Sequence, residues 1–340
     1  MTSKVSIVIV TWNSRRYIEK CLECLRKQLY TDYQIIVVDN ASLDGTIEYL
    51  NQNHSHLTII KNQKNFGFAK AGNQGIKTSE GEFILMLNPD VFPEPNFLEE
   101  LVKTLSQNSR YGAAGGKLLL FNHGEKSRTI DSTGLFLTRS FKARDRGNLN
   151  EDRGQYDQEE NIFAVCGAAV IFRREALEKI KTEGEYFDED FFAYYEELDV
   201  CWRMQLIGFE CGYNPRAVAY HVRGGSGFKP KFFQKTSFMQ RITLRNRYFM
   251  LIKNLSKINL LIFFPFFFLT ELVLMFYSCI CAPHLLKVYG DILWDLKRFL
   301  KKRSFIQNSR TKDSQYIRNW IKKGTLQHIK FKHFRHYEKA

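Results

Sequence analysis

Phe83-Ile84-Leu85-Met86-Leu87, followed directly by Asn88-Pro89-Asp90, predicts the architecture of this chain. Five consecutive apolar residues predict a strand that is buried on both faces, and Pro89 stiffens the turn after it. Open α/β sheets bind their ligands just beyond the carboxyl ends of the strands. The position of Asp90 therefore predicts a ligand-binding carboxylate. The alternative is a turn residue that caps the next helix.

Two earlier segments repeat this arrangement of an apolar run that ends in polar residues. Val5 to Val10 leads into Thr11-Trp12-Asn13, and Ile35 to Val38 leads into Asp39-Asn40. Apolar residues at helical spacing separate the runs, and this alternation predicts a mostly parallel sheet with right-handed crossovers. The expected fold class is therefore α/β, with a Rossmann-like sheet whose polar strand ends meet at one edge.

Weaker patterns place the remaining elements. Helices are predicted at residues 15–30 with Ser14 as the N-cap, after the turn 42–46, at 69–76, 96–105 and 174–180, and around Trp202; strands are predicted at 57–60, 162–172 and 217–221. The charged, glycine-containing segment 139–160 predicts a mobile loop. Glu196-Glu197 is expected in a loop before a helix.

The charge is distributed unevenly along the chain. The net charge of the 340 residues is +14, and 44% of them are hydrophobic, as is typical of a packed protein. Residues 287–340 contain 15 Lys and Arg against 4 Asp and Glu, a net charge of +11, which leaves +3 for residues 1–286. This distribution indicates an anionic partner for the tail, either a membrane or a nucleic acid. The Phe-rich sequence beside the tail favours lipid, so no nucleic-acid partner is expected.

The seven cysteines indicate a reducing compartment. Cys21-x-x-Cys24 has no second Cys or His pair at zinc spacing, so we interpret the cysteines as reduced, small hydrophobic residues. The first predicted strand begins within five residues of Met1, and no signal peptide precedes it. The catalytic part is therefore expected in the cytosol.

Five motifs, taken in order, resemble a known family. They are Val5 to Asn13, Val38-Asp39-Asn40-Ala41-Ser42-Leu43-Asp44-Gly45-Thr46, Asn65-Phe66-Gly67-Phe68, Asn88-Pro89-Asp90 and Tyr195-Glu196-Glu197-Leu198-Asp199. Together they resemble the family 2 glycosyltransferases of the GT-A fold, especially the rhamnosyltransferase-like branch of bacterial surface-polysaccharide synthesis. The resemblance covers roughly residues 4 to 250. It implies an inverting enzyme that uses a nucleotide-diphosphate sugar, either dTDP-rhamnose or a UDP-sugar.

The resemblance implies that the first two strand ends hold the nucleotide. Asp39 would accept a hydrogen bond from the N3–H of a pyrimidine base, and Thr11 and Asn13 would line the base and ribose. Asp44 either binds the donor or only caps the following helix. Gly67 either lets the backbone approach the nucleotide or forms a packed turn.

The nucleoside diphosphate of such a donor gains negative charge as the glycosidic bond breaks. A divalent cation held by oxygen ligands stabilises that charge, which predicts Mg²⁺ or Mn²⁺ at Asp90. Many relatives have two aspartates here, whereas this chain has Asn88 and Asp90. The resemblance places His221 within reach of the metal, where imidazole would favour Mn²⁺; the alternative is a structural histidine. Arg245 would close over the diphosphate, or else face solvent or lipid.

The acceptor hydroxyl must lose a proton as it attacks, so a carboxylate base is required. The resemblance places this base in the pair Glu196 and Glu197. We expect Glu197 to be the base, with Glu196 as the second candidate. Asp199 is expected to cap the helix and to pair with Arg203. Gly167 is expected to let the acceptor sugar approach closely.

Residues 258–282 are strongly apolar and long enough to cross a bilayer once. Pro265 and Glu271 interrupt the segment, and lysines flank both of its ends. The following helical pattern suits an anionic membrane surface, because it sets Ile292, Leu293, Leu296, Phe299 and Leu300 opposite Lys297, Arg298, Lys301 and Lys302. We expect a monotopic or re-entrant anchor on the cytoplasmic face of the cell membrane. A single span and a buried or dimer-forming helix are the alternatives.

These inferences divide the chain into four parts and define its expected function. The parts are a GT-A domain (1–225), a helical extension (226–257), an apolar membrane-associated segment (258–282) and a basic amphipathic tail (283–340). We expect a metal-dependent glycosyltransferase that acts on a lipid-linked or polysaccharide acceptor, with homo-oligomerisation left open. The alternatives are a polyprenyl-phosphate glycosyltransferase and a catalytically weak scaffold of a membrane glycan-assembly complex. A dinucleotide oxidoreductase is disfavoured, because no Gly-x-Gly-x-x-Gly follows the first strand.

Overall fold

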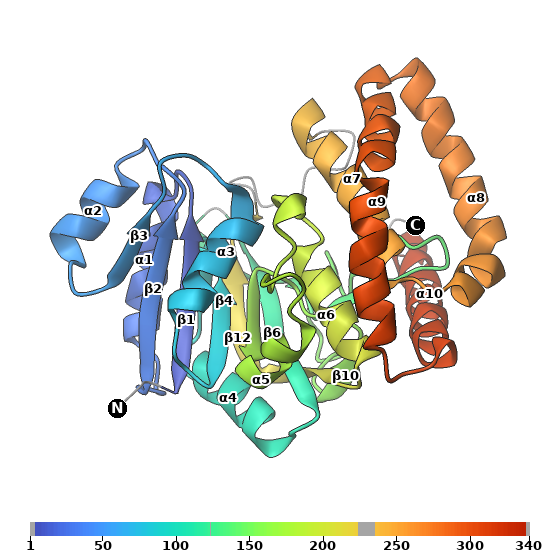
Figure 1. Cartoon of the computed structure of the whole chain (residues 1–340). Coiled ribbons are helices and arrows are strands. Elements are labelled where there is room, and N and C mark those ends of the chain that lie inside the picture. Colours follow the sequence, from blue (N-terminus) through green and yellow to red (C-terminus); the bar gives the residue numbers. More distant parts are fainter. Residues whose placement is uncertain (1–3, 123, 224–234, 338–340) are drawn as a thin grey trace.

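A ten-stranded sheet organises the molecule (Figure 1). The computed structural model describes residues 4–122, 124–223 and 235–337. The strand order is β10-β12-β6-β11-β4-β1-β2-β3, with β5 paired to β12 and β7 to β6, and β8 and β9 form a separate two-stranded ribbon. The strands are β1 (Val5–Thr11), β2 (Tyr33–Asp39), β3 (Thr58–Lys61), β4 (Phe83–Leu87), β5 (Val91–Pro93), β6 (Tyr111–Asn122), β7 (Glu125–Ser132), β8 (Leu135–Leu137), β9 (Ala143–Asp145), β10 (Glu160–Ile162), β11 (Ala169–Arg173) and β12 (Glu210–His221). The predicted fold class is confirmed, since β4, β1, β2 and β3 are parallel neighbours that form one half of the sheet and end at β3.

Alternating side chains along the strands build one apolar layer on each face of the sheet. Val8 and Met86 point into a layer covered by α3, α5 and α6, whereas Ile7 and Leu85 point into a layer covered by α1 and α4. The helices of this part are α1 (Arg15–Arg26), α2 (Thr46–Asn53), α3 (Gly67–Thr78), α4 (Phe97–Gln107), α5 (Arg174–Ile180) and α6 (Glu196–Leu206). Burial on both faces explains why β4 is uniformly apolar.

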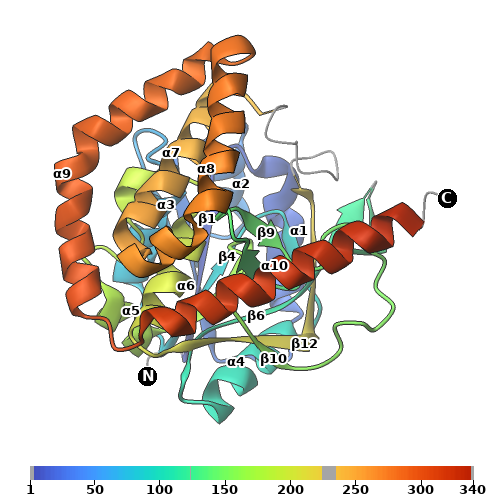
Figure 2. The same ribbon diagram turned by 90° about the vertical axis from the view of Figure 1, so that its right-hand side faces the viewer.

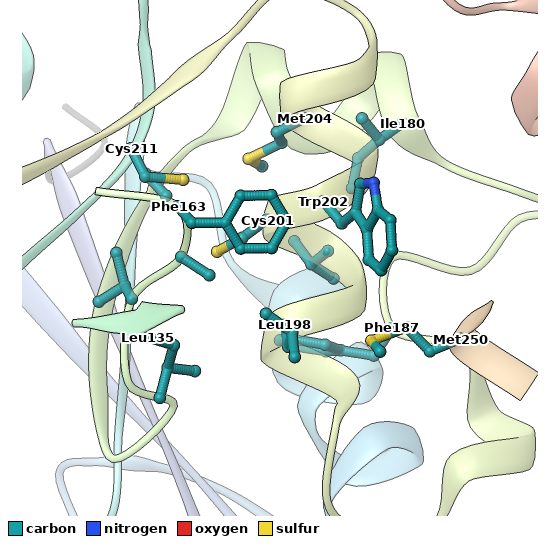
Figure 3. Close-up of a cluster of buried hydrophobic side chains, with 14 of the residues drawn as sticks. Leu135, Phe163, Ile180, Phe187, Leu198, Cys201, Trp202, Met204, Cys211 and Met250 are labelled. Carbon is teal, nitrogen blue, oxygen red and sulfur yellow. The ribbon is translucent and has the colours of Figure 1, made fainter. Parts of the chain in front are cut away.

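Helix α6 is anchored by the largest side chain of the first layer. Trp202 is fully buried, and its ring meets that of Phe163 edge-on at 5.7 Å between centroids (Figure 3). Cys201 and Cys211 are buried in the same cluster, where they act as the small hydrophobic residues predicted from the sequence. This packing fixes the helix that begins with Glu196.

Helix α1 begins at Arg15, as predicted, but is shorter than the predicted helix 15–30. It ends at Arg26, because the chain then turns and the N–H of Leu29 donates to the carbonyl of Pro95 at 2.8 Å. Ser14 occupies the N-cap position, but its hydroxyl accepts from the N–H of Trp12 rather than from the helix. Leu29 lies beyond the end of the helix and is exposed.

Two longer predictions are corrected between residues 139 and 172. The predicted strand 162–172 is divided into β10 and β11, because the chain leaves the sheet between them and turns at Cys166, whose carbonyl accepts from the N–H of Ala169. The segment 139–160, predicted as a mobile loop, is mostly irregular, but contacts with the rest of the protein hold it in place. It contains β9, and Asp152 pairs with Lys117 at 2.9 Å.

The C-terminal part consists of four helices beside the sheet (Figures 1 and 2). They are α7 (Ser237–Asn254), α8 (Lys257–Ile280), α9 (Lys287–Asn308) and α10 (Ser314–Tyr337), with a 3₁₀ turn at Pro283–Leu286. Phe249 of α7 and Phe299 of α9 stack with ring centroids 3.7 Å apart. The expected lipid-facing surface of α9 is therefore wrong in part: Phe299 and Lys302 are buried against the protein. The predicted boundary at 225/226 lies outside the described residues.

Helix α8 packs through one narrow stripe and exposes the rest of its surface. The inward-facing stripe repeats every three or four residues and consists of Asn259, Phe263, Phe267, Glu271, Leu274 and Ser278. Glu271 accepts from Arg247 of α7 at 2.7 Å, so the one acidic residue of α8 is paired with protein. By length and composition α8 is apolar enough to cross a membrane, and almost none of its most apolar window is buried.

Candidate active site

The ends of β1 and β2 build one half of the candidate site. Thr11 lies opposite Asp39 in the parallel register, and its hydroxyl donates to Asp39 Oδ1 at 2.8 Å. Ser42 donates twice, from its hydroxyl to Oδ1 at 2.5 Å and from its N–H to Oδ2 at 2.9 Å. Asp39 is buried and held in one orientation, with acceptor capacity left on Oδ2.

Asn13 joins this half to the loop after β2. Its backbone has a φ of 51°, a left-handed conformation. Its N–H donates to the Ser42 hydroxyl at 2.8 Å, and its side-chain oxygen accepts from the N–H of Leu43 at 2.8 Å. Hydrogen bonds therefore connect the two loops that are predicted to bind the nucleotide.

The carboxylate of Asp44 accepts hydrogen bonds from the first residues of two helices. One oxygen accepts from the N–H of Thr46, where α2 begins, and the other accepts from the N–H of Arg15, where α1 begins. Burial opposes ionisation, but hydrogen bonds from the Thr46 hydroxyl and then from the N–H groups of Arg15 and Thr46 lower the pKa of Asp44. The contacts favour the capping alternative, and the donor-binding role of Asp44 stays a prediction.

The surroundings of Gly67 favour the alternative in which it forms a packed turn. Its φ is +83°, and a Cβ added there would lie 2.4 Å from the carbonyl oxygen of Phe192. Gly67 therefore lets the start of α3 approach the loop that precedes Glu196. Its predicted contact with the nucleotide remains untested.

Asp90 and His221 meet across two paired strands. Val91 of β5 lies opposite His221 of β12, and the N–H of Val222 donates to the carbonyl of Asp90 at 2.9 Å. His221 Nε2 and Asp90 Oδ1 are 3.5 Å apart. The alternative in which Asp90 caps a helix is wrong, because β5 follows it directly.

Sequence reasoning missed Asp131, which lies behind this pair. Its Oδ2 is 2.8 Å from Nδ1 of His221, and its Oδ1 pairs with Arg223. Arg223 also pairs with Asp145 of β9 at 3.3 Å. Asp131 is fully buried, and no local motif marks it, because it reaches His221 from 90 residues away.

The Asp90–His221 pair fits a divalent cation of the kind the family resemblance implies. Two ligand bonds of about 2.1 Å each can bridge atoms that lie 3.5 Å apart. Within the described ranges no group of three or more His, Cys, Asp and Glu side chains forms a complete metal site. Two protein ligands suffice where substrate phosphates and water complete the coordination, as is usual for Mg²⁺. Asn88 lies at the same turn, and its carbonyl accepts from the N–H of Val91 at 3.1 Å.

Glu196 and Glu197 begin helix α6 rather than lying in a loop before it. Glu196 is buried, and its Oε2 has no hydrogen-bond partner among the described residues. Burial, and then the charge of Glu197, raise the pKa of Glu196 well above its usual range. Glu197 is partly exposed, although its Oε2 is buried. The environments of the two carboxyls therefore differ, and the role of Glu197 as the base stays a prediction.

Gly167 makes room for Glu197 beside the turn that carries Asp90. A Cβ at Gly167 would lie 3.0–3.1 Å from three side-chain carbons of Glu197. The next residue, Ala168, accepts from the N–H of Asn88 at 2.9 Å. The predicted base and the predicted metal ligand thus flank one short segment.

Strained backbone precedes the two glutamates. Phe192, Tyr194 and Tyr195 all have positive φ, between 63° and 74°. The side-chain amide of Asn246 donates to three carbonyls of residues 191–194 at 2.7–2.9 Å. Arg245 donates to the carbonyl of Asp190 at 2.6 Å, so in this structure it holds the same loop rather than lying free in solvent. Helix α7 therefore imposes the conformation of this loop.

A buried ionic network lies beside the loop that precedes Glu196. Asp188 pairs with Lys253 of α7 and with Lys302 of α9, each at 2.6 Å. Burial opposes ionisation, but Lys253 and then Lys302 hold the pKa of Asp188 below its usual range. Asp199 pairs with Arg203 as predicted, but it accepts from Lys253 instead of capping α6.

Comparison with known protein families shows to which family the chain belongs. Residues 6–181, just over half of the sequence, match the model of glycosyl transferase family 2. The chain belongs to this family. The matched range contains seven of the predicted site residues, namely Thr11, Asn13, Asp39, Asp44, Gly67, Asn88 and Asp90. Membership in the rhamnosyltransferase-like branch stays a prediction.

Relatives of this family 2 protein occur in archaea and bacteria. It is 28% identical over 318 residues to the dolichyl N-acetyl-alpha-D-glucosaminyl phosphate 3-beta-D-2,3-diacetamido-2,3-dideoxy-beta-D-glucuronosyltransferase of Methanococcus voltae, covering 88% of each chain. It is 22% identical over 222 residues to the poly-beta-1,6-N-acetyl-D-glucosamine synthase of Staphylococcus epidermidis, covering 64% of this chain and 49% of that protein. It spans only 25% of a third relative, the uncharacterized protein y4gI of Sinorhizobium fredii, at 25% identity.

Solved structures share the fold of this family 2 protein. Residues 1–349 of S. aureus TarS, in complex with UDP-GlcNAc, superpose with a TM-score of 0.58 at 18% identity, covering 94% of this chain and 90% of that one. GalNAc-T7 with UDP, GalNAc and Mn²⁺ gives a TM-score of 0.57 at 16% identity, covering 73% and 48%. At these identities the likeness shows a shared fold and no more.

Proposed function

We propose that this family 2 protein is an inverting, metal-dependent glycosyltransferase that moves a sugar from a nucleotide-diphosphate sugar to a hydroxyl of a lipid-linked or polysaccharide acceptor. One observation carries the proposal. Asp39, the Asp90–His221 pair and Glu197 are presented on adjoining segments at one edge of the sheet. These are the groups that base recognition, leaving-group stabilisation and deprotonation require.

The donor half suits a pyrimidine nucleotide. Asp39 retains an acceptor position for the N3–H of uracil or thymine, and Thr11 and Ser42 fix its carboxylate. Both dTDP-rhamnose and a UDP-sugar carry this group. The TarS structure with UDP-GlcNAc supports the UDP-sugar.

The Asp90 turn would hold the diphosphate through a divalent cation. When bound, the cation neutralises negative charge that develops on the leaving diphosphate. Asp90 and His221 would be its protein ligands, and Asp131 keeps His221 turned toward that position. The GalNAc-T7 structure with UDP and Mn²⁺ supports a metal in this fold.

Glu197 would take the proton of the acceptor hydroxyl. A base must be ionised and accessible, and Glu197 is the more exposed member of the pair. The buried, high-pKa carboxyl of Glu196 stays protonated to higher pH. Direct attack of one hydroxyl on the sugar inverts the configuration at its anomeric carbon.

The apolar outer face of α8 would hold the enzyme on the cytoplasmic face of the membrane. Its inner stripe packs against protein along the whole helix, from Asn259 to Ser278. A span surrounded by lipid would have to break these contacts, including the Arg247–Glu271 pair. This favours a monotopic anchor over a span. The name of the Methanococcus voltae relative, which includes a dolichyl phosphate sugar, supports a lipid-linked acceptor.

Cysteine labelling in intact cells tests this anchor. Cys279 and Cys281, at the end of α8, are exposed, whereas Cys21, Cys166 and Cys211 are buried. A membrane-impermeant maleimide should leave the pair unlabelled until the cells are opened. Labelling from outside would establish a span and contradict the monotopic anchor.

Calorimetric titration with a panel of nucleotides and nucleotide sugars tests the donor half. We expect UDP- or dTDP-linked sugars to bind in the presence of Mn²⁺, and purine nucleotides to bind more weakly. Asp39→Ala should remove the preference for pyrimidines. Equal binding of purine and pyrimidine nucleotides would contradict the role of Asp39.

A further inference from the structure

The β8–β9 ribbon lies between the Asp90 site and the apolar helix α8. At one end, Asp145 of β9 pairs with Arg223, which in turn pairs with Asp131 behind His221. At the other end, the ring of Phe141 lies 6.0 Å from that of Phe263 in α8. Figure 2 looks onto this face, with α8, β9 and α10 side by side.

Helix α7 fixes the turn of the ribbon in place. Arg247 donates to the carbonyls of Ser140 and Phe141 at 2.9 and 3.4 Å, and it pairs with Glu271 of α8 at 2.7 Å. The ribbon and α8 are therefore joined through one buried guanidinium. Their relative position is built into the fold.

Three cations on this ribbon pair with no carboxylate of the described residues. Lys142 and Arg144 are exposed, and Arg139 lies over the ring of Phe266, 5.3 Å from its centroid, on the outer face of α8. None of the three forms an ion pair within the described part of the chain, whereas the nearby Arg146 and Arg247 are both paired. Positive charge is thus concentrated there without compensation.

We propose that Arg139, Lys142 and Arg144 bind the phosphate of a lipid-linked acceptor whose hydrocarbon chain lies on the exposed face of α8. The ligand class follows from the two chemistries that adjoin here, uncompensated cations and apolar surface. Lys142 is three residues from Asp145, about 10 Å of extended chain at roughly 3.3 Å per residue. This spacing leaves room for an acceptor sugar between the phosphate and the Asp90 site. The inference deepens the proposed function and rests on it.

Vesicle co-sedimentation of the full chain tests the proposal without using catalysis. The probes are phosphatidylcholine vesicles that carry a few mole per cent of a long polyprenyl phosphate, of the uncharged polyprenol, or of phosphatidylglycerol at matched charge. The wild type should prefer the polyprenyl phosphate vesicles over both others. R139Q/K142Q/R144Q should lose that preference, by about fivefold for each cation removed.

A matched variant controls for charge and folding. K257Q/K297Q/K322Q removes three exposed cations from α8, α9 and α10 that form no ion pair among the described residues, and it should keep the preference. Both variants should unfold at the wild-type temperature. Equal binding of phosphatidylglycerol, a preference that survives in R139Q/K142Q/R144Q, or equal loss in the control would overturn the proposal. If these results occur while donor hydrolysis is intact, only this inference fails; absent hydrolysis overturns the proposed function instead.

Discussion

Asp131 orients His221 toward Asp90. Its carboxylate lies 2.8 Å from Nδ1 of the imidazole, which leaves Nε2 directed at the Asp90 carboxylate 3.5 Å away. Carboxylate–histidine pairs of this kind fix the ring orientation and the tautomer of metal-binding histidines. The pair therefore extends the candidate metal site into the interior of the protein.

Asp131→Asn should weaken Mn²⁺ binding in the presence of UDP by about 10–100-fold, because the amide no longer fixes the imidazole. Titration followed by the paramagnetic resonance of free Mn²⁺ measures this directly. Asp145→Asn is the control, since it also removes a carboxylate from Arg223 but does not touch His221. Unchanged Mn²⁺ affinity in Asp131→Asn would contradict the assignment.

Glu197→Gln should lower kcat by about 10²–10⁴-fold, because the amide keeps the shape of the side chain but cannot accept a proton. The Kd of the donor should stay within about twofold of the wild-type value, since Glu197 acts on the acceptor. Steady-state kinetics with calorimetry separates the two effects. A larger loss of kcat in Glu196→Gln would reverse the assignment within the pair.

Glu196→Gln should change the dependence of stability on pH. The pKa of Glu196 is raised by burial and then by Glu197, so the folded protein holds this proton more tightly than the unfolded chain does. Above the ordinary value of 4.5, wild-type stability is therefore lost progressively as the pH rises toward the folded pKa. The glutamine variant has no such loss, and its advantage in Tm should grow with pH. An advantage that shrinks with rising pH would be inconsistent with this environment.

Lys302→Met should destabilise the protein by about 3–5 kcal/mol, because it leaves Asp188 with one fewer cation in a buried site. It should also lower kcat, since Asp188 directly precedes the strained loop that leads to Glu196. Chemical denaturation and steady-state kinetics measure the two effects. Lys301→Met, at an exposed position on the same helix, should change stability by less than about 0.5 kcal/mol. Similar values for the two variants would mean that the network is not important for stability.

Local patterns predicted the elements whose burial they encode. Strand β4 at Phe83–Leu87 and helix α5 at Arg174–Ile180 match the predicted ranges, because each pattern is complete within its own segment. Asp90 lies in the turn that follows this buried strand, and its binding role stays a prediction. The lipid-facing surface predicted for α9 was wrong in part, because an amphipathic pattern fits an interface with protein as well as one with lipid.

Local sequence patterns could not predict ion pairs between residues that are far apart in the chain. Asp131 and His221 are separated by 90 residues, and Asp188 and Lys302 by 114. Each pairing depends on where the sheet and the C-terminal helices bring the chain, and no short motif encodes that path. The isolated sequence therefore named Asp90 and His221, which the structure brings together, but not Asp131, which holds His221 in place.

Release of nucleoside diphosphate from a panel of nucleotide sugars tests the central claim most directly. The full chain should hydrolyse or transfer at least one UDP- or dTDP-linked sugar, with activity that requires Mg²⁺ or Mn²⁺ and is lost in Asp90→Ala although that variant folds normally. No release from any donor, full activity in excess chelator, or wild-type activity of Asp90→Ala would contradict the account.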